Sequence, residues 1–145
     1  MASGSSLKGK TPYRGFHIGY PGSGKTGALA SLLNVGYKIR VLTFEGNYEP
    51  LVNFADERAL DNLDVISFQD RYRNGDKYME VIGIPEAFNN AMKMLQEWKY
   101  KDDDGNEVNL GKSVDWGLDT IVVIDSLTSL AVAIKDRAMK MNNKK

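Results

Sequence analysis

Short apolar runs alternate with longer mixed stretches along this chain, and the runs have the length and residue types of strands. Apolar and β-branched side chains are concentrated in KIRVLTF at 38–44, in LDVISF at 63–68 and in TIVVI at 120–124. The pattern at 13–18 indicates a further short strand. We predict a strand at each of these runs, and the nearly continuous apolar run at 120–124 is typical of a strand covered on both faces.

Between these runs, apolar residues recur at the spacing of an amphipathic helix. Leu29, Leu32 and Leu33 follow this spacing, and so do Phe88 and Met92. The helix that contains Phe88 starts at Pro85, a residue suited to the first turn. We predict helices at four segments: 25–35, 50–60, 85 to 98 or 100, and 129–141. Phe88, Met92 and Leu95 are expected to be core residues.

Two charged segments remain, and we expect neither to be part of the main sheet. The segment 69–83 is predicted to be irregular, and 101–117 to be a solvated excursion with a hairpin around Asp104 and Gly105. Strands that alternate with helices predict the α/β class. We therefore expect a three-layer α/β/α sandwich around a mainly parallel sheet.

Composition limits the classes of protein that need to be considered. The 145 residues suit one domain, expected at 12–145 after a flexible tail at 1–11. Acidic and basic side chains each number 19, so the zero formal charge gives no general attraction to nucleic acid or membranes. The absence of cysteine excludes disulfides, and the presence of one histidine excludes a multi-histidine metal site. That residue, His17, is expected to be a packed strand residue rather than a catalyst. No run approaches the roughly 20 apolar residues of a membrane span, so we expect no membrane contact and a cytoplasmic location.

The most specific motif is GYPGSGKT at 19–26, which matches the phosphate-binding pattern G-x-x-x-x-G-K-[ST] between a predicted strand and a predicted helix. Glycines permit positive φ, so that backbone N–H groups can turn toward phosphate oxygens at the positive end of the following helix. The alternative is a glycine turn that binds nothing. The residues expected to contact a nucleotide are Gly19, Tyr20, Pro21, Gly22, Ser23, Gly24, Lys25, Thr26 and Gly27.

Two acidic residues follow predicted strands and could complete such a site. Asp125 ends the strand 120–124, where a carboxylate can hold Mg²⁺ through its water shell, or can merely cap the strand end. Glu45 ends the strand 38–44 and could polarise a water molecule for attack on the γ-phosphate, or could cap a turn. Within the motif, Lys25 would contact the β- and γ-phosphates and Thr26 would bind Mg²⁺.

Three segments together resemble the RecA and archaeal RadA-type recombinase ATPases, and look closest to small RecA-like nucleotide-binding proteins of bacteriophages, of AAA type. These are GYPGSGKT, VLTFEGNYEP and TIVVIDSLTSL, which occur in the family's order at about its spacing. The resemblance covers about residues 13–135. It implies that Glu45 is the water-activating base, that Lys25 and Thr26 contact phosphate and Mg²⁺, and that Asp125 is the Walker B acid.

The resemblance also implies a partner and an assembly. Such proteins act on single-stranded DNA in recombination, repair or replication, and they place ATP between protomers of a ring or filament. A phage-encoded member would work in the host cytoplasm. These proteins continue past the helix after Asp125 with further strands, whereas this sequence ends at Lys145. We therefore expect either a core that is incomplete at its C-terminus or a pared-down relative.

The leading hypothesis is therefore an ATPase that uses ATP and Mg²⁺, with Lys25, Glu45 and Asp125 as its catalytic residues. One alternative is a small-molecule or nucleotide kinase, in which Arg71 and Arg73 would belong to a lid. Another is a nucleotide-binding assembly module that does not hydrolyse its ligand.

Other charged clusters have simpler interpretations. Arg71 and Arg73 are loop charges or, with Tyr72 as a stacking partner, contacts to phosphate or DNA. The acidic residues near 102–107 do not have calcium-loop spacing, so they are interpreted as a solvated loop. The basic C-terminal residues are interpreted as a solvated face with a weak indication of polyanion contact: Lys135, Arg137, Lys140, Lys144 and Lys145.

Overall fold

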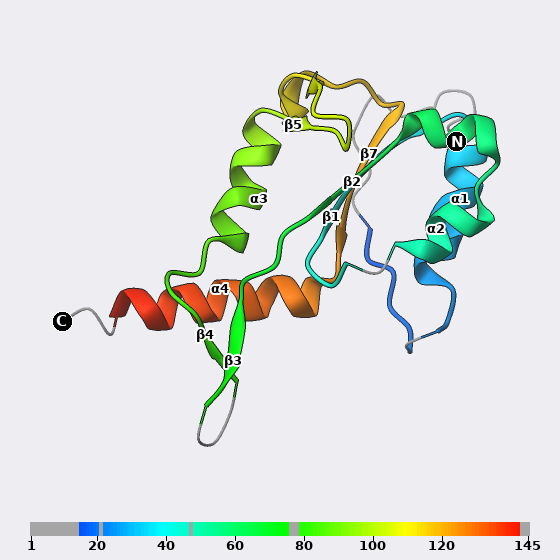
Figure 1. The fold of residues 1–145 in the computed structure, drawn as a ribbon. Coiled ribbons are helices and arrows are strands. Elements are labelled where there is room, and N and C mark those ends of the chain that lie inside the picture. The colour runs from blue at the N-terminus through cyan, green and yellow to red at the C-terminus, as the bar shows by residue number, and fades with distance from the viewer. Residues whose placement is uncertain (1–14, 21, 47, 76–78, 143–145) are drawn as a thin grey trace, which may run out of the picture.

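A parallel sheet forms the centre of the computed structural model, which describes residues 15–20, 22–46, 48–75 and 79–142 (Figure 1). Its strands are β1 (Lys38–Thr43), β2 (Leu63–Ser67) and β7 (Thr120–Asp125). They lie in the order β2-β1-β7, and every pairing is parallel. The predicted strands at 38–44, 63–68 and 120–124 are thus confirmed.

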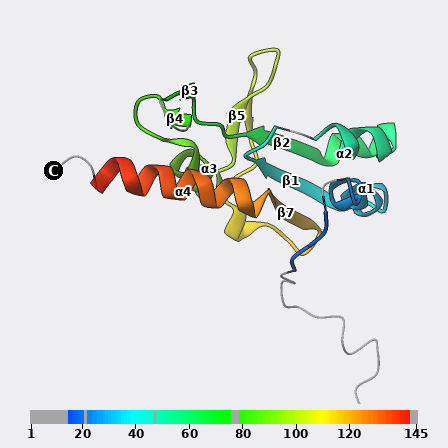
Figure 2. The same ribbon diagram turned by 90° about the horizontal axis from the view of Figure 1, so that it is seen from below.

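Helices cover both faces of this sheet (Figures 1 and 2). One side carries α1 (Lys25–Asn34), α2 (Glu49–Phe54) and the 3₁₀-helix η1 (Glu57–Asn62). The other side carries α3 (Ala87–Gln96) and α4 (Leu127–Asn142). The described chain is therefore of mixed helix and strand around a small parallel sheet, while the wider RecA-like sandwich stays a prediction.

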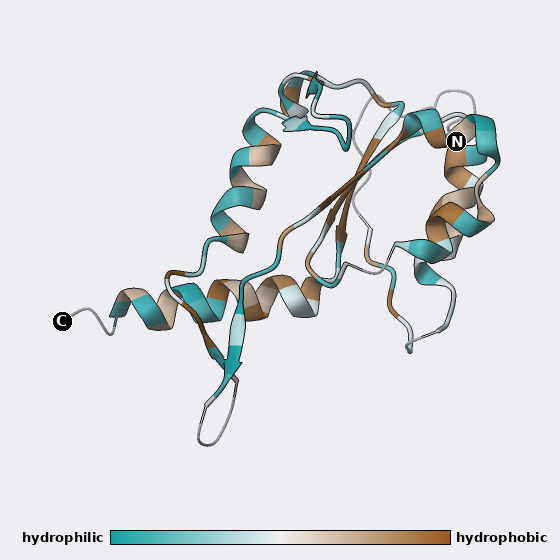
Figure 3. Ribbon diagram, in the orientation of Figure 1, coloured by the Kyte–Doolittle hydropathy of each residue, from teal (hydrophilic) through white to brown (hydrophobic). Residues whose placement is uncertain are grey.

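Alternate side chains of β1 supply two separate hydrophobic cores. Ile39 and Val41 pack with Leu29, Leu33 and other residues of the α1 side. Leu42 packs on the opposite side with a cluster that includes Trp98 from the segment after α3. Every β1 residue after Lys38 is buried, as expected for a strand paired at both edges. Figure 3 shows the same pattern as apolar colour along the central strands.

The boundaries of three predicted helices differ from the observed ones. The predicted helix at 50–60 divides, because Ala55 is extended and α2 ends at Phe54. The helix predicted from Pro85 begins at Ala87 and ends at Gln96. It stops there because the backbone of Trp98 joins the next hairpin, where its N–H donates to the Gly111 carbonyl at 2.8 Å. Phe88, Met92 and Leu95 pack against the core, as predicted. The last helix begins at Leu127, two residues earlier than predicted.

The two charged segments form antiparallel hairpins. The prediction of an irregular segment at 69–83 is wrong, since β3 (Tyr72–Asn74) pairs with β4 (Met79–Val81) in a projecting hairpin (Figure 1). The predicted hairpin around Asp104 and Gly105 is confirmed as β5 (Lys99–Lys101) and β6 (Glu107–Asn109). Gly105 has a positive φ of 84°, and its N–H donates to the Asp102 carbonyl at 3.0 Å.

The prediction of a strand at 13–18 is wrong for residues 15–18, because these residues have no regular secondary structure. Both edges of β1 are already paired, and no described strand lies against 15–18, so its backbone has no ladder to join. Its side chains are open to solvent: Phe16 is 79% exposed and Ile18 is 94% exposed. His17 is likewise exposed rather than packed. Residues 13 and 14 and the predicted tail at 1–11 lie outside the described residues, so the domain boundary stays a prediction.

No helix among the described residues combines the length and the apolar character that crossing a membrane requires.

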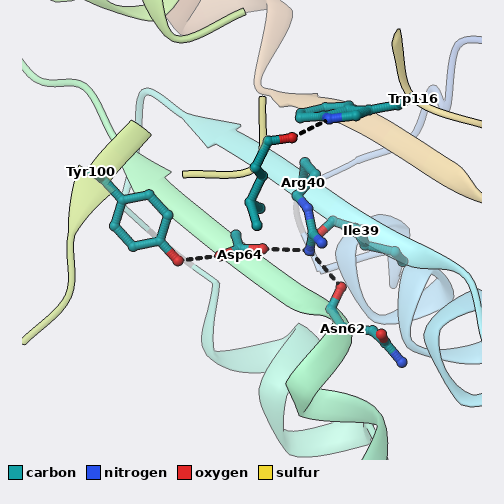
Figure 4. Close-up of polar contacts among 7 residues, drawn as sticks. Ile39, Arg40, Asn62, Asp64, Tyr100 and Trp116 are labelled. Carbon is teal, nitrogen blue, oxygen red and sulfur yellow. Dashed lines mark hydrogen bonds and ion pairs between the residues drawn. The ribbon is translucent and has the colours of Figure 1, made fainter. Parts of the chain in front are cut away.

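A buried ion pair between β1 and β2 is linked to the β5–β6 hairpin by a hydrogen bond from Tyr100 (Figure 4). The Arg40 guanidinium pairs with the Asp64 carboxylate, and these side chains are only 9% and 11% exposed. Arg40 also donates to the carbonyl of Asn62 at 2.8 Å, while the Tyr100 hydroxyl donates to Asp64. Each charge in this network therefore has a partner, which is the condition for burying charge without a large cost.

Arg40→Met should destabilise the fold by about 3–5 kcal/mol, because it leaves the Asp64 carboxylate buried without its partner. Urea unfolding would measure this loss. Arg73→Met is the matched control: Arg73 pairs with Glu80 at 3.1 Å, but the two side chains are 69% and 47% exposed. That substitution should cost less than about 1 kcal/mol. Equal losses in the two variants would contradict a special role for the buried pair.

Tyr100 should ionise far above the usual pH for a phenol. Burial, followed by the hydrogen bond to Asp64 and the charge of Asp64, raises the pKa of Tyr100 from 10.0 to about 12. Because the folded pKa is the higher one, the contribution of Tyr100 to stability is complete below pH 10 and is lost as the pH rises through about 12. Alkaline absorbance titrations of the wild type and of Tyr100→Phe would be compared, and the difference between the two curves would report the pKa of Tyr100. A difference transition near pH 10 in folded protein would contradict it.

Candidate functional site

The carboxyl edge of the sheet brings together four of the predicted site residues. Thr43 and Asp125 are register partners at the ends of β1 and β7, which places Glu45 and Asp125 at the same edge. Lys25 and Thr26, the first residues of α1, are close enough to influence the Asp125 carboxylate. Residues from three separate parts of the chain therefore meet at one place.

The loop before α1 has the backbone that its glycines were expected to permit. Gly22 has a φ of 78° and Gly24, the N-cap of α1, has a φ of 81°, both in the left-handed region. No side chain caps this helix end, so its first N–H groups and its positive dipole face outward. These are the features that make a helix N-terminus an anion-binding site. Pro21 lies outside the described residues.

The Lys25 ammonium is held by the loop itself. It donates to the carbonyl of Gly19 at 2.8 Å and to that of Tyr20 at 2.9 Å. An ammonium has three N–H donors, so one remains for a ligand. The predicted contacts Tyr20 and Ser23 are exposed. A Cβ on Gly19 would lie 2.4 Å from the Ser23 Oγ, so position 19 accepts only glycine unless Ser23 moves.

Gly27 is needed for a different contact. A Cβ at this position would lie 3.2 Å from the Phe54 ring, so the glycine lets α2 pack closely against α1. The predicted contact of Gly27 with nucleotide stays a prediction, and the structure gives the residue a packing role in addition.

Glu45 is exposed, yet its carboxylate is firmly held. Its Oε1 atom accepts hydrogen bonds from the Ser126 hydroxyl and, at 2.7 Å, from the Ser129 hydroxyl. These two bonds, helped by the nearby charge of Lys25, lower the pKa of Glu45 below its usual value. Glu45 is therefore an anion at neutral pH, as a general base must be.

The turn that presents Glu45 is fixed by Thr43. This side chain is 1% exposed, and its Oγ1 accepts the N–H groups of Glu45 at 3.2 Å and of Gly46 at 2.9 Å. Gly46 has a positive φ of 77°, which completes the turn. The side chain at the end of β1 thus sets the direction in which the chain leaves the sheet.

Asp125 has the opposite electrostatic situation. Burial, followed by repulsion from the Glu45 carboxylate, raises the pKa of Asp125, while a hydrogen bond from Thr26 and the charge of Lys25 act against this rise. Two carboxylates therefore share one edge with a single ammonium, and an added cation would relieve their repulsion.

The predicted Mg²⁺ ligands at this edge are one carboxylate and one hydroxyl, and the binding of Mg²⁺ there stays a prediction. Among the described residues there is no cluster of three or more histidine, cysteine, aspartate or glutamate side chains that could hold an ion. Asp125 and Thr26 would contribute a carboxylate and a hydroxyl. Mg²⁺ is often bound in this way, by one or two protein oxygens, with water and phosphate oxygens completing the octahedron.

Sequence reasoning missed the three hydroxyl groups around Glu45. Thr43 precedes the acid by two residues, and Ser126 and Ser129 occupy the S-x-x-S start of the last helix. A serine directly before a helix is a capping signal, and Ser126 does accept the Ser129 N–H at 3.3 Å. That signal predicts the cap but not the contact with a strand that lies far away in sequence.

The predicted cluster at Arg71, Tyr72 and Arg73 lies on or beside the projecting β3–β4 hairpin and bonds within the chain. Arg73 pairs with Glu80 at 3.1 Å, and the Tyr72 hydroxyl donates to Asp136 at 3.0 Å. Burial and this hydrogen bond raise the pKa of Tyr72 to about 12. These contacts favour the interpretation of Arg73 as an ordinary surface charge, although it lies on β3 and not in a loop, and they connect Tyr72 to α4.

Comparison of the chain with protein-family models, with curated proteins and with solved structures found no match in any of the three.

Thr43→Val should destabilise the protein by about 1–3 kcal/mol, because the backbone N–H groups of Glu45 and Gly46 would lose their acceptor while the volume stays the same. Thermal or urea unfolding would measure the change. Thr128→Val is the matched control, since Thr128 is exposed. Similar small losses in both variants would show that the turn does not depend on the hydroxyl.

Proposed function

We propose that this chain is a P-loop ATPase of RecA-like type that binds ATP with Mg²⁺ and hydrolyses the γ-phosphate bond. One observation carries the proposal: Lys25, Thr26, Glu45 and Asp125 converge at a single sheet edge beside the N-terminus of α1. Each is the residue type that phosphoryl transfer to water requires at its place.

In this proposal the chain's own groups have separate tasks. The loop N–H groups and Lys25 bind phosphate oxygens and stabilise the negative charge that develops on them. Glu45, an exposed anion, accepts a proton from the attacking water. Asp125 and Thr26 would hold Mg²⁺, which supplies charge neutralisation at the phosphates when bound.

We further propose, from the resemblance, a phage-encoded protein that acts on single-stranded DNA in the host cytoplasm as a homo-oligomeric ring or filament. Phe16 and Ile18, just before the phosphate loop in sequence, and Tyr20, its second residue, have exposed apolar side chains. They are candidates for contact with a neighbouring subunit at the nucleotide. Light scattering with and without ATP, and phosphate release with and without single-stranded DNA, would test the two partners.

Phosphate release from ATP with Mg²⁺ is the direct test of hydrolysis. Lys25→Met should lose nucleotide binding, whereas Glu45→Gln should still bind ATP and lose a factor of about 10²–10⁴ in turnover. Glu49→Gln is the matched control, because Glu49 is an exposed acid four positions after Glu45, at the first residue of α2. It should behave like the wild type.

Three results would overturn the proposal. Transfer of phosphate to a nucleoside without release to water would indicate a kinase. Binding of ATP without turnover by the wild type would indicate a non-hydrolysing module. Undiminished turnover in Glu45→Gln would show that Glu45 is not the general base.

A further inference from the structure

The Glu45 carboxylate is restrained on one oxygen only. Both hydroxyl donors, Ser126 and Ser129, bond to Oε1. No hydrogen bond within the described part of the chain ends on Oε2. One end of the carboxylate is therefore fixed, and the other is left to accept a proton.

The two donors are themselves fixed by the start of α4. The Ser126 carbonyl accepts the Leu130 N–H at 3.0 Å, and its hydroxyl accepts the Ser129 N–H at 3.3 Å. The two hydroxyl oxygens are 3.2 Å apart. Leu130 is buried in the core beneath this turn. The donors therefore belong to a packed helix end, and they do not depend on a mobile side chain for their position.

We infer that Ser126 and Ser129 are positioning residues that hold Glu45 by Oε1 so that Oε2 faces the attacking water. The inference rests on the proposed function and deepens it. An exposed glutamate would otherwise sample several rotamers, and a displacement of about 1 Å at a reacting group can cost a factor of about 10² in rate. The hydroxyl bonds select one arrangement, and they also favour the ionised form that a base needs.

Capping the start of α4 is an alternative role for these serines. The two residues differ in their contacts, and this difference separates capping from the positioning of Glu45. Ser126 accepts a backbone N–H of α4 and is therefore a cap as well as a donor to Glu45. For the Ser129 hydroxyl, the described contacts are with the Ser126 hydroxyl and with Glu45. Loss of the Ser129 hydroxyl should therefore affect Glu45 with little effect on the helix.

Kinetics of phosphate release from ATP with Mg²⁺ provide the first test. Ser129→Ala should lower kcat by about tenfold with KM and ATP affinity unchanged, and the double variant with Ser126→Ala should lower it further. Ser129→Thr restores the hydroxyl and should return kcat to within about twofold of the wild type. Thr128→Ala, which removes an exposed hydroxyl from the same helical turn, should have no effect.

Carbon-13 spectra of glutamate-labelled free protein provide a test that needs no turnover. The Glu45 carboxylate resonance, assigned by its loss in Glu45→Gln, should move in Ser129→Ala and stay in place in Thr128→Ala. An unmoved resonance in Ser129→Ala would overturn the contact on which the inference depends.

The outcomes separate the inference from the proposed function. Wild-type kcat in Ser129→Ala, together with lost turnover in Glu45→Gln, would overturn the positioning role and leave the ATPase intact. A wild-type protein that releases no phosphate would overturn the proposed function, and the positioning role with it. A rise in KM with unchanged kcat would also overturn positioning, because it would place Ser129 in ligand binding.

Discussion

The parallel pairing of β1 with a strand on each side is the constraint on which the rest of this structure depends. A strand paired at both edges has its backbone groups satisfied, and its side chains must then be covered on both faces. Ile39 and Val41 accordingly pack toward α1, and Leu42 packs toward α3 and α4. The same parallel register sends the chain out of β1 and β7 at one edge, so the strand that organises both cores also brings Glu45 and Asp125 together.

Polar side chains of β1 and its neighbours make further contacts that hold the sheet, the β5–β6 hairpin and the site together. Arg40 is the one charged side chain in the buried part of β1, and it is tolerated because Asp64 on the neighbouring strand and the Asn62 carbonyl face it. Tyr100 extends the network to the β5–β6 hairpin, so a short excursion far along the chain is tied to the sheet. At the other end of β1, Thr43 uses its hydroxyl to bend the backbone toward the site.

Residue patterns within short segments predicted most helices and strands. The predictions failed where contacts between distant segments decide the structure. The runs that became β1, β2 and β7 have the residue types of strands and also a neighbouring strand to pair with. The prediction that 120–124 is covered on both faces is wrong, because Val122 and Ile124 of β7 are 39% and 40% exposed. The run at 13–18 has the residue types alone, and residues 15–18 have no ladder to join. Trp98 fits a helical spacing, but its backbone pairs with the segment at Leu110 and Gly111. For the site, residue type predicted Lys25, Glu45 and Asp125, whereas the contact of Ser129 with Glu45 spans 84 positions and has no local signal.

The distribution of charge at the sheet edge accounts for the chemistry that the site can support. The Glu45 carboxylate is stabilised as an anion by two hydroxyl donors, whereas burial and repulsion from Glu45 destabilise the charge on Asp125. Equal environments would give two similar acids, but these environments give one free base and one group that gains from a nearby cation. Lys25 is shared between both carboxylates and the loop carbonyls, so it cannot fully compensate either acid. In the proposed function, a divalent cation held beside Asp125 would relieve this imbalance, and Glu45 would remain available to accept a proton from water, as hydrolysis of a phosphate anhydride requires.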